Sequence, residues 1–221
     1  MLKKFFAFTM AEVLVVIAVI GVTAALALPT VSNNIEEKKV VSALRKIYPE
    51  LETAYQAVVS QYGKPPEWAD ADNNTDGSQM NLLFHNKLLK HMTYKAEDST
   101  NRKIILKDNS EIEYYILKTP HMLSNEFDFS TKTQHNSCTG EMGTFVVDIN
   151  GSQKGENTIG RDKFTFYICY EEGIVPSGES DAGPIANNTN NDNAAWIIKA
   201  GNMDYLKCAD QLDWNTKRTC K

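Results

Sequence analysis

Apolar residues are concentrated near the start of the chain. Residues 8–28 form a run of 21 positions in which Glu12 is the only charged residue. As a helix this run would be about 31 Å long, which matches the hydrocarbon core of a bilayer, about 30 Å thick. We therefore predict a transmembrane helix. Two alternatives are a helix buried in the core of a soluble protein and a cleaved secretory signal, whose small-x-small site would be residues 25–27 (ALA).

A second apolar pattern follows at helical period. Over residues 29–62, apolar side chains recur in steps of three and four, and charged residues occupy the other faces. This single stripe predicts an amphipathic helix. Because the pattern stops at Gly63 and Pro65-Pro66 end the helix, we expect packing against the chain's own globular part rather than a free coiled coil. The stripe consists of Val41, Leu44, Tyr48, Leu51, Tyr55, Val58 and Tyr62.

Two prolines lie within this long helical region. Pro29 and Pro49 each remove an intrahelical hydrogen bond and clash with the carbonyl group four residues earlier. Each is therefore expected to kink the helix. The alternative is two separate helices that are broken at Pro29.

The rest of the chain has a different pattern. A turn-rich loop precedes a short amphipathic helix predicted around residues 80–92, and residues 177–193 form a polar low-complexity loop. Residues 108–110 give a hairpin signal. One long helix followed by short strands, without regular β–α alternation, predicts an α+β fold with a mainly antiparallel sheet. The strand-like runs are residues 103–107, 111–117, 144–149, 163–170, 195–199 and 203–206.

The charge of the chain is mildly acidic, −5, with 23 Lys and Arg against 28 Asp and Glu. No run rich in Lys and Arg occurs, which disfavours a dedicated nucleic-acid binder. Lys3 and Lys4 precede the apolar run, whereas the charges of residues 36–39 after it cancel. By the positive-inside rule, we expect the N-terminus in the cytoplasm and the remaining chain on the outer side.

All four cysteines lie on this expected outer side, and none forms a C-x-x-C pair. An even number of cysteines in an exported domain indicates two disulfides, for which three connectivities are possible. We prefer Cys138–Cys169, which would tie two strand regions, and Cys208–Cys220, which would close a short C-terminal loop. Free buried thiols are the alternative.

The sequence carries no recognisable catalytic motif. Its four histidines are scattered, and no H-E-x-x-H, G-x-S-x-G, Walker loop or G-x-G-x-x-G occurs. We therefore do not expect an enzyme. The histidines are His85, His91, His121 and His135.

Calcium is the one cofactor that the sequence suggests. Asp72, Asn74, Asp76 and Gly77 match the opening of an EF-hand loop. Leu83, however, stands where the closing bidentate glutamate is required, so a solvated polar loop without a cofactor is the preferred interpretation. A second polar cluster has no standard ligand spacing and consists of Asp148, Asn150, Asn157 and Asp162.

Glu12 is unusual within the apolar run. A carboxylate inside a membrane costs roughly 2.5 to 3.5 kcal/mol at the centre of a helix and less near an end, and such acids usually have a partner. No basic residue lies in the run, but a cut just before Phe8 would create an α-amine on the same segment. The residues removed by that cut, 1–7, form a short basic leader.

The segment resembles the N-terminus of type IV prepilins and type II secretion pseudopilins. Residues 8–12 (FTMAE) and the apolar run that ends at Pro29 carry the resemblance. It implies cleavage before Phe8 by prepilin peptidase, N-methylation of Phe8, and pairing of Glu12 with the α-amine of a neighbouring subunit in a filament. Ala7 stands where the family nearly always has glycine, so cleavage is expected to be slower or absent.

The resemblance implies a structural subunit of a type IV pilus-like or type II secretion filament, with a pilin-like α+β fold. Its expected partners are copies of itself, other pilin-like subunits, prepilin peptidase and the bacterial inner membrane. The expected parts are a leader (1–7), a transmembrane and assembly helix (8–28), an amphipathic helix (29–62) and a periplasmic or extracellular head (63–221). The alternative is a monomeric, single-pass membrane-anchored binding or sensor domain.

Overall fold

The computed structural model divides the chain into two compact units, Met1–Lys39 and Val40–Lys221. It describes residues 9–65, 77–116, 138–178, 184 and 192–220, and for residues 27–34 and 77–80 it describes the backbone alone.

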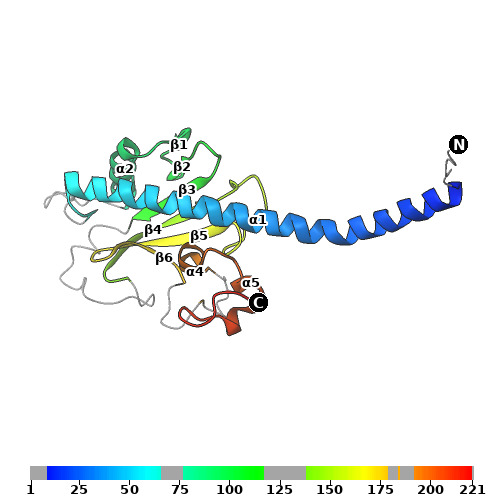
Figure 1. Ribbon diagram of the computed structural model, residues 1–221. Helices are drawn as coiled ribbons and strands as arrows, with labels where there is room; N and C mark the ends of the chain where they lie inside the picture. Colours follow the sequence, from blue (N-terminus) through cyan, green and yellow to red (C-terminus); the bar gives the residue numbers. More distant parts are fainter. Residues whose placement is uncertain (1–8, 66–76, 117–137, 179–183, 185–191, 221) are drawn as a thin grey trace, which may run out of the picture. The chain divides into compact units, whose positions relative to one another are not determined.

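The long predicted helix is present as α1, which is helical over Met10–Tyr62 and begins in the first unit (Figure 1). Its backbone is helical through both Pro29 and Pro49, so the alternative of two helices separated at Pro29 does not apply. The kinks expected at the two prolines stay predictions. At Pro49 the carbonyl oxygen accepts a hydrogen bond from Thr53 Oγ1 at 2.7 Å.

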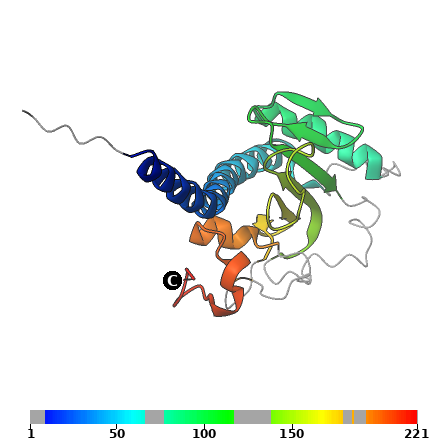
Figure 2. The ribbon, with the colours of Figure 1, turned by 90° about the vertical axis from the view of Figure 1, so that its right-hand side faces the viewer.

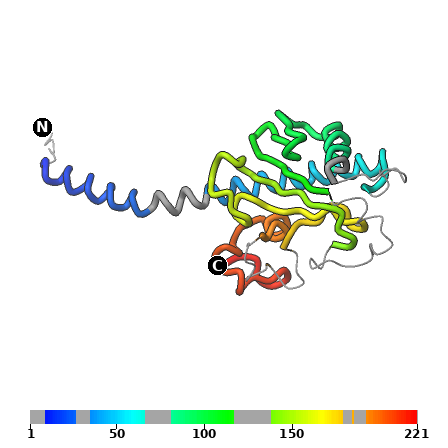
Figure 3. Tube along the Cα trace, turned by 180° about the vertical axis from the view of Figure 1, so that it is seen from behind, coloured from blue at the N-terminus to red at the C-terminus, as the bar shows by residue number. Residues whose placement is uncertain are grey.

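The second unit is built on a six-stranded sheet, in which every strand pairs antiparallel with the next along the chain (Figures 1 and 3). This topology confirms the predicted α+β fold with an antiparallel sheet. The strands are β1 (Ala96–Asp98), β2 (Lys103–Ile105), β3 (Glu111–Ile116), β4 (Glu141–Asp148), β5 (Lys163–Cys169) and β6 (Gly173–Pro176).

The β4 strand carries an irregularity in its pairing with β5, between Glu141 and Gly143. Gly143 also lies against β3, where a Cβ atom on it would come within 2.3 Å of the Tyr115 carbonyl oxygen. Only glycine fits such a close backbone approach.

Residues 40–62 of α1 pack on one face of this sheet. The inward-facing residues Phe164, Phe166 and Ile168 alternate along β5 with half-exposed ones, and they share a single core with α1. The predicted amphipathic stripe is confirmed: Leu44, Leu51, Tyr55 and Val58 are buried, and Val41, Tyr48 and Tyr62 are partly buried against the same core.

Helices occupy both ends of the sheet. α2 (Gly77–Leu88), followed by the 3₁₀ turn η2 (Leu89–His91), corresponds to the helix predicted around residues 80–92. Its Phe84 ring lies 5.5 Å from that of Tyr114 and 5.6 Å from that of Phe145, measured between centroids. Figure 2 shows α2 near β1 and β2, and α4 and α5 toward the other end of the sheet.

The prediction of strands at residues 195–199 and 203–206 is wrong. The chain there forms the helices α4 (Ala194–Ala200) and α5 (Tyr205–Cys208), followed by the 3₁₀ turn η3 (Ala209–Gln211). Gly201 ends α4 at φ 77°, and its N–H donates to the Ile197 carbonyl at 3.0 Å, as is usual for a glycine after a helix. The short apolar run is therefore the buried face of a helix.

Candidate functional site

The start of α1 holds the residue predicted to direct assembly. Glu12 Oε2 accepts hydrogen bonds from the Thr9 N–H at 2.8 Å and from Thr9 Oγ1 at 2.9 Å. In return the Glu12 N–H donates to Thr9 Oγ1 at 3.3 Å. This reciprocal pair is a capping box, with Thr9 at the N-cap and Glu12 at the third helical position. Glu12 Oε1 accepts no hydrogen bond from any described residue.

The next four turns of α1 expose apolar side chains on all sides of the helix. Since successive residues are about 100° apart around a helix, neighbouring positions cover the full circumference. The one hydroxyl group among them, on Thr23, donates back to the Val19 and Ile20 carbonyls at 3.0 Å each. The exposed apolar residues of this segment are Val13, Leu14, Val15, Val16, Ile17, Val19, Ile20, Val22 and Leu26, and Met10 in the first turn is exposed as well.

In the part of the chain that the structure describes, no helix has both the length and the hydropathy needed to cross a membrane. The predicted transmembrane segment, residues 8–28, begins at Phe8, which lies outside the described residues, as does Ala7. The predicted processing site between these two residues therefore stays a prediction.

The four cysteines form Cys138–Cys169 and Cys208–Cys220, the pairing preferred from the sequence. No cysteine is free, so the alternative of buried thiols is wrong. Cys138 precedes β4 and Cys169 ends β5, which ties two neighbouring strands together as expected. The second disulfide joins the end of α5 to the penultimate residue of the chain.

The EF-hand-like residues Asp72, Asn74 and Asp76 lie outside the described residues, and so do His121 and His135. Of the other two histidines, His85 is buried in α2, and its Nε2 lies 2.8 Å from Glu97 Oε2. Among the residues that the structure describes, no group of three or more His, Cys, Asp or Glu side chains is arranged to hold a metal ion.

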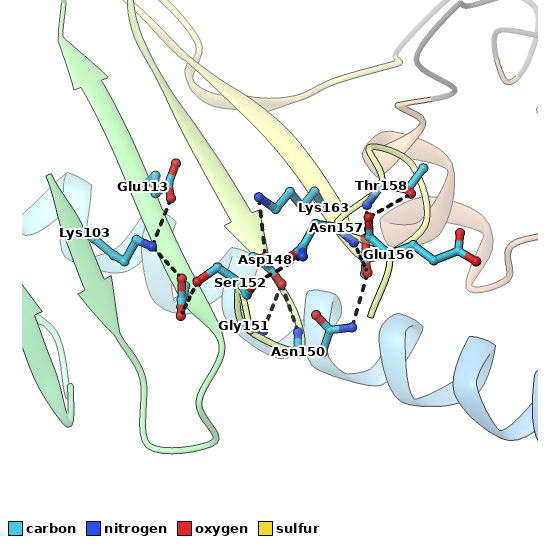
Figure 4. A network of polar contacts seen from close by, with 12 residues as sticks. Lys103, Glu113, Asp148, Asn150, Gly151, Ser152, Glu156, Asn157, Thr158 and Lys163 are labelled. Atoms are coloured by element: carbon cyan, nitrogen blue, oxygen red, sulfur yellow. Dashed lines mark hydrogen bonds and ion pairs between the residues drawn. The ribbon is translucent and has the colours of Figure 1, made fainter. Parts of the chain in front are cut away.

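The second polar cluster does come together, in the loop between β4 and β5 (Figure 4). The Asp162 carboxylate accepts hydrogen bonds from the N–H groups of Asn157 at 3.0 Å and Thr158 at 2.5 Å, and from Asn150 Nδ2 at 3.3 Å. The Asp162 carboxylate thereby connects both ends of this loop, which is a local structural role.

Asp148 organises the beginning of the same loop. Its Oδ1 accepts the N–H groups of Asn150 at 3.3 Å and Gly151 at 2.9 Å, and its Oδ2 lies 3.6 Å from Lys163 Nζ. Burial raises the pKa of the Asp148 carboxyl above its ordinary value, and the Lys163 charge partly opposes this shift. N–H groups thus occupy the Asp162 carboxylate and Asp148 Oδ1, whereas Asp148 Oδ2 is paired only with the Lys163 charge.

A third acid connects this loop to the sheet. Glu111 accepts hydrogen bonds from Lys103 Nζ at 2.8 Å and Ser152 Oγ at 3.1 Å. Burial raises the pKa of the Glu111 carboxyl, but the hydrogen bonds and charge of Lys103 and the Ser152 hydroxyl bring it below its ordinary value. Lys103 Nζ also lies 3.2 Å from Glu113 Oε1. Figure 4 shows these two side chains pointing toward each other.

Comparison with models of known families, with curated proteins and with solved structures gave no match. The Thr9–Glu12 capping box was not predicted from the sequence, although a threonine three residues before a glutamate at the start of a helix is its signature.

Proposed function

We propose that the protein is a structural subunit of a type IV pilus-like or type II secretion filament. In this proposal the subunit is anchored in the bacterial inner membrane, processed before Phe8, and assembled through the first part of α1. The observation that carries the proposal is the position of Glu12, a single acid at the start of a helix whose apolar side chains are exposed on every side.

The exposed apolar surface needs an apolar environment. Side chains such as Leu14, Ile17 and Ile20 are each about 60% exposed, at 64%, 60% and 59%. Leaving so much apolar surface in water is unfavourable, and only lipid or several neighbouring helices can cover a helix on all sides. Thr23 fits either environment because its hydroxyl is already bonded within the helix.

The carboxylate needs a partner in such an environment. Thr9 occupies Glu12 Oε2, which leaves Oε1 for a donor from another chain. An α-amine created at Phe8 of a neighbouring subunit would supply a positive charge for it. Pairing would offset the cost of desolvating both charges as the helix enters a bundle.

The capping box offers a competing, purely local explanation of Glu12, and one substitution separates the two. Glu12→Gln keeps the side-chain shape and the capping interaction, since glutamine serves at the same capping position, but it removes the negative charge. If Glu12 only caps the helix, Glu12→Gln assembles like the wild type. If it pairs with an amine, the variant fails to assemble.

The experiment co-expresses the chain with a prepilin peptidase and a filament assembly system, and measures sheared filaments against membrane-associated protein. We expect Glu12→Gln to reduce filaments at least about tenfold at equal abundance, which corresponds to about 1.4 kcal/mol. Glu36→Gln, an exposed charge outside the apolar segment, is the matched control and should assemble normally. Normal filaments from Glu12→Gln would contradict the proposal.

A Glu12 that only caps the helix needs no neighbouring subunit. This local role is compatible with the second candidate, a monomeric membrane-anchored binding or sensor domain. Mass analysis of the N-terminal peptide distinguishes them. N-methylated Phe8 supports the filament subunit, whereas a retained Met1 with the intact leader supports the monomer.

A further inference from the structure

The two disulfides differ in their surroundings. Cys138 and Cys169 are both 0% exposed and form a small core with Val175, against which Tyr167 packs. Cys208 is 8% exposed, and Cys220 is only partly buried near the end of the chain. Because thiol–disulfide exchange requires direct access of a thiolate to sulfur, the C-terminal disulfide is the accessible one.

The C-terminal disulfide holds a segment that is bonded to α4 through Asn202. Asn202 Nδ2 donates to the Arg218 carbonyl at 2.8 Å, and Asn202 Oδ1 accepts from Trp196 Nε1 of α4 at 2.9 Å. The Cys220 N–H donates to Asp204 Oδ2 at 2.9 Å. The Trp214 ring lies against Trp196, with centroids 4.6 Å apart. The closed C-terminal loop thus supports α4 from one side.

The last turn of α4 is bonded in turn to α1. Arg45 donates to the Ile198 carbonyl from Nε at 3.0 Å and from a terminal guanidinium nitrogen at 2.8 Å. A cation at these carbonyls is favourable because they carry the negative end of the helix dipole. Arg45 also lies close to Gly201, and both α4 and this part of α1 belong to the second unit.

We propose that the Cys208–Cys220 disulfide is a redox-sensitive clamp that fixes α4 on α1. With the disulfide closed, the C-terminal loop is hydrogen-bonded to Asn202, and Asn202 is hydrogen-bonded to Trp196. This fixes α4 in the position where its last carbonyl groups accept hydrogen bonds from Arg45. With the disulfide open, the C-terminal segment separates from Asn202 and the α4–α1 contact loosens. The Cys138–Cys169 disulfide, whose two sulfur-bearing residues are fully buried, stays closed under the same conditions.

The redox step is an ordinary thiol–disulfide exchange. A thiolate of a dithiol reductant attacks the Cys220 sulfur, the S–S bond breaks, and Cys208 leaves as a thiolate that takes up a proton. The second thiol of the reductant then displaces Cys220 from the mixed disulfide, so the reductant becomes a disulfide and the protein gains two thiols. The reverse exchange with a disulfide oxidoreductase closes the clamp.

The test uses the full chain in detergent micelles and titrates it with dithiothreitol. Alkylation followed by peptide mass analysis reports which cysteines open. We expect Cys208 and Cys220 to be alkylated at concentrations at least about tenfold lower than Cys138 and Cys169, in line with their accessibility. Opening of Cys138–Cys169 first, or of both disulfides together, would overturn the proposal.

Hydrogen exchange on the same samples reports the coupling. Backbone amides of α4 and of residues 40–48 should exchange at least about tenfold faster once Cys208–Cys220 is open, while those of β4 and β5 stay unchanged. Asn202→Ala should reproduce faster exchange in α4 with the disulfide closed. Asn215→Ala, an exposed position in the same loop, is the matched control. Unchanged exchange in α4 after reduction would show that no clamp exists.

Discussion

The ring of Tyr48 in α1 stacks on the ring of Phe166 in β5, with centroids 5.5 Å apart and planes inclined by 16°. The Tyr48 hydroxyl also donates to the Ile174 carbonyl of β6 at 3.1 Å. One side chain therefore connects α1 to the last two strands. Substitutions of Tyr48 therefore measure how much the packing of α1 on the sheet contributes to the free energy of unfolding.

Removing the hydroxyl and the ring of Tyr48 should have graded effects. Tyr48→Phe loses one hydrogen bond, and we expect a loss of about 1 kcal/mol in the free energy of unfolding. Tyr48→Ala also loses the ring stacking and should cost roughly 2 to 4 kcal/mol. Guanidinium-induced unfolding in detergent, followed by tryptophan fluorescence, measures both, with the exposed Ser42→Ala as control. Equal losses for the two variants would contradict a role for the ring.

Gly201 should not tolerate a side chain. Its φ of 77° is unfavourable for other residues, and a Cβ atom would lie 2.9 Å from the terminal nitrogens of Arg45. We expect Gly201→Ala to lower the free energy of unfolding by roughly 1 to 2 kcal/mol. Combining it with Arg45→Ala tests the contact in a double-mutant cycle. Additive losses would show that the crowding against Arg45 contributes nothing.

The sequence predicted the elements whose pattern is long and regular. The stripe from Val41 to Tyr62 has a helical period over six turns, and the structure buries that stripe. The strands around Ile112 and Phe166 alternate apolar and polar residues because one face of the sheet is covered. These signals are local and repeat many times, so sequence alone was sufficient.

The errors concern short elements and contacts between distant residues. In α4, Trp196, Ile197 and Ile198 are adjacent, and one helical turn of apolar residues has no period that distinguishes it from a strand. The β6 strand ends at Pro176 and contains a glycine at its start, which weakens any strand signal. The hydrogen bond from Arg45 to the Ile198 carbonyl joins residues 153 positions apart, and no local sequence pattern predicts it.

Removing the two disulfides should have unequal effects on stability. The paired residues are 31 positions apart in Cys138–Cys169 and 12 in Cys208–Cys220. Chain-entropy arguments give losses of about 4 and about 3 kcal/mol for loops of these lengths. Thermal unfolding of Cys138→Ala/Cys169→Ala and Cys208→Ala/Cys220→Ala compares the two. A larger loss for the shorter loop would show that native contacts, and not loop length, dominate.

Calcium should leave the melting temperature unchanged. The Asp162 carboxylate is occupied by three N–H donors, and Lys163 Nζ already lies beside Asp148. A cation there would have to displace these partners. Scanning calorimetry with millimolar calcium and with chelator tests the expectation. A calcium-dependent increase that disappears in Asp76→Asn would identify the EF-hand-like loop instead, and one that disappears in Asp162→Asn would identify the network.

Asp148 should make the head less stable as the pH rises from acid toward neutral. Burial raises the pKa of its carboxyl above the ordinary value of 3.8, so the folded chain holds a proton that the unfolded chain releases. The stability linked to this group is complete below about pH 3.8 and is lost as the pH rises through the raised pKa.

Asp148→Asn removes this dependence while its side-chain oxygen can still accept the N–H groups of Asn150 and Gly151. The free energy of unfolding of the variant minus that of the wild type should therefore increase as the pH rises from about 3.5 to 7. Asp213→Asn is the control of opposite sign, because hydrogen bonds from Asn215 and Thr216 lower the pKa of Asp213. Its difference should decrease with pH. Denaturant unfolding across this pH range measures both, and a flat or falling difference for Asp148→Asn would mean that Lys163 fully compensates the buried charge.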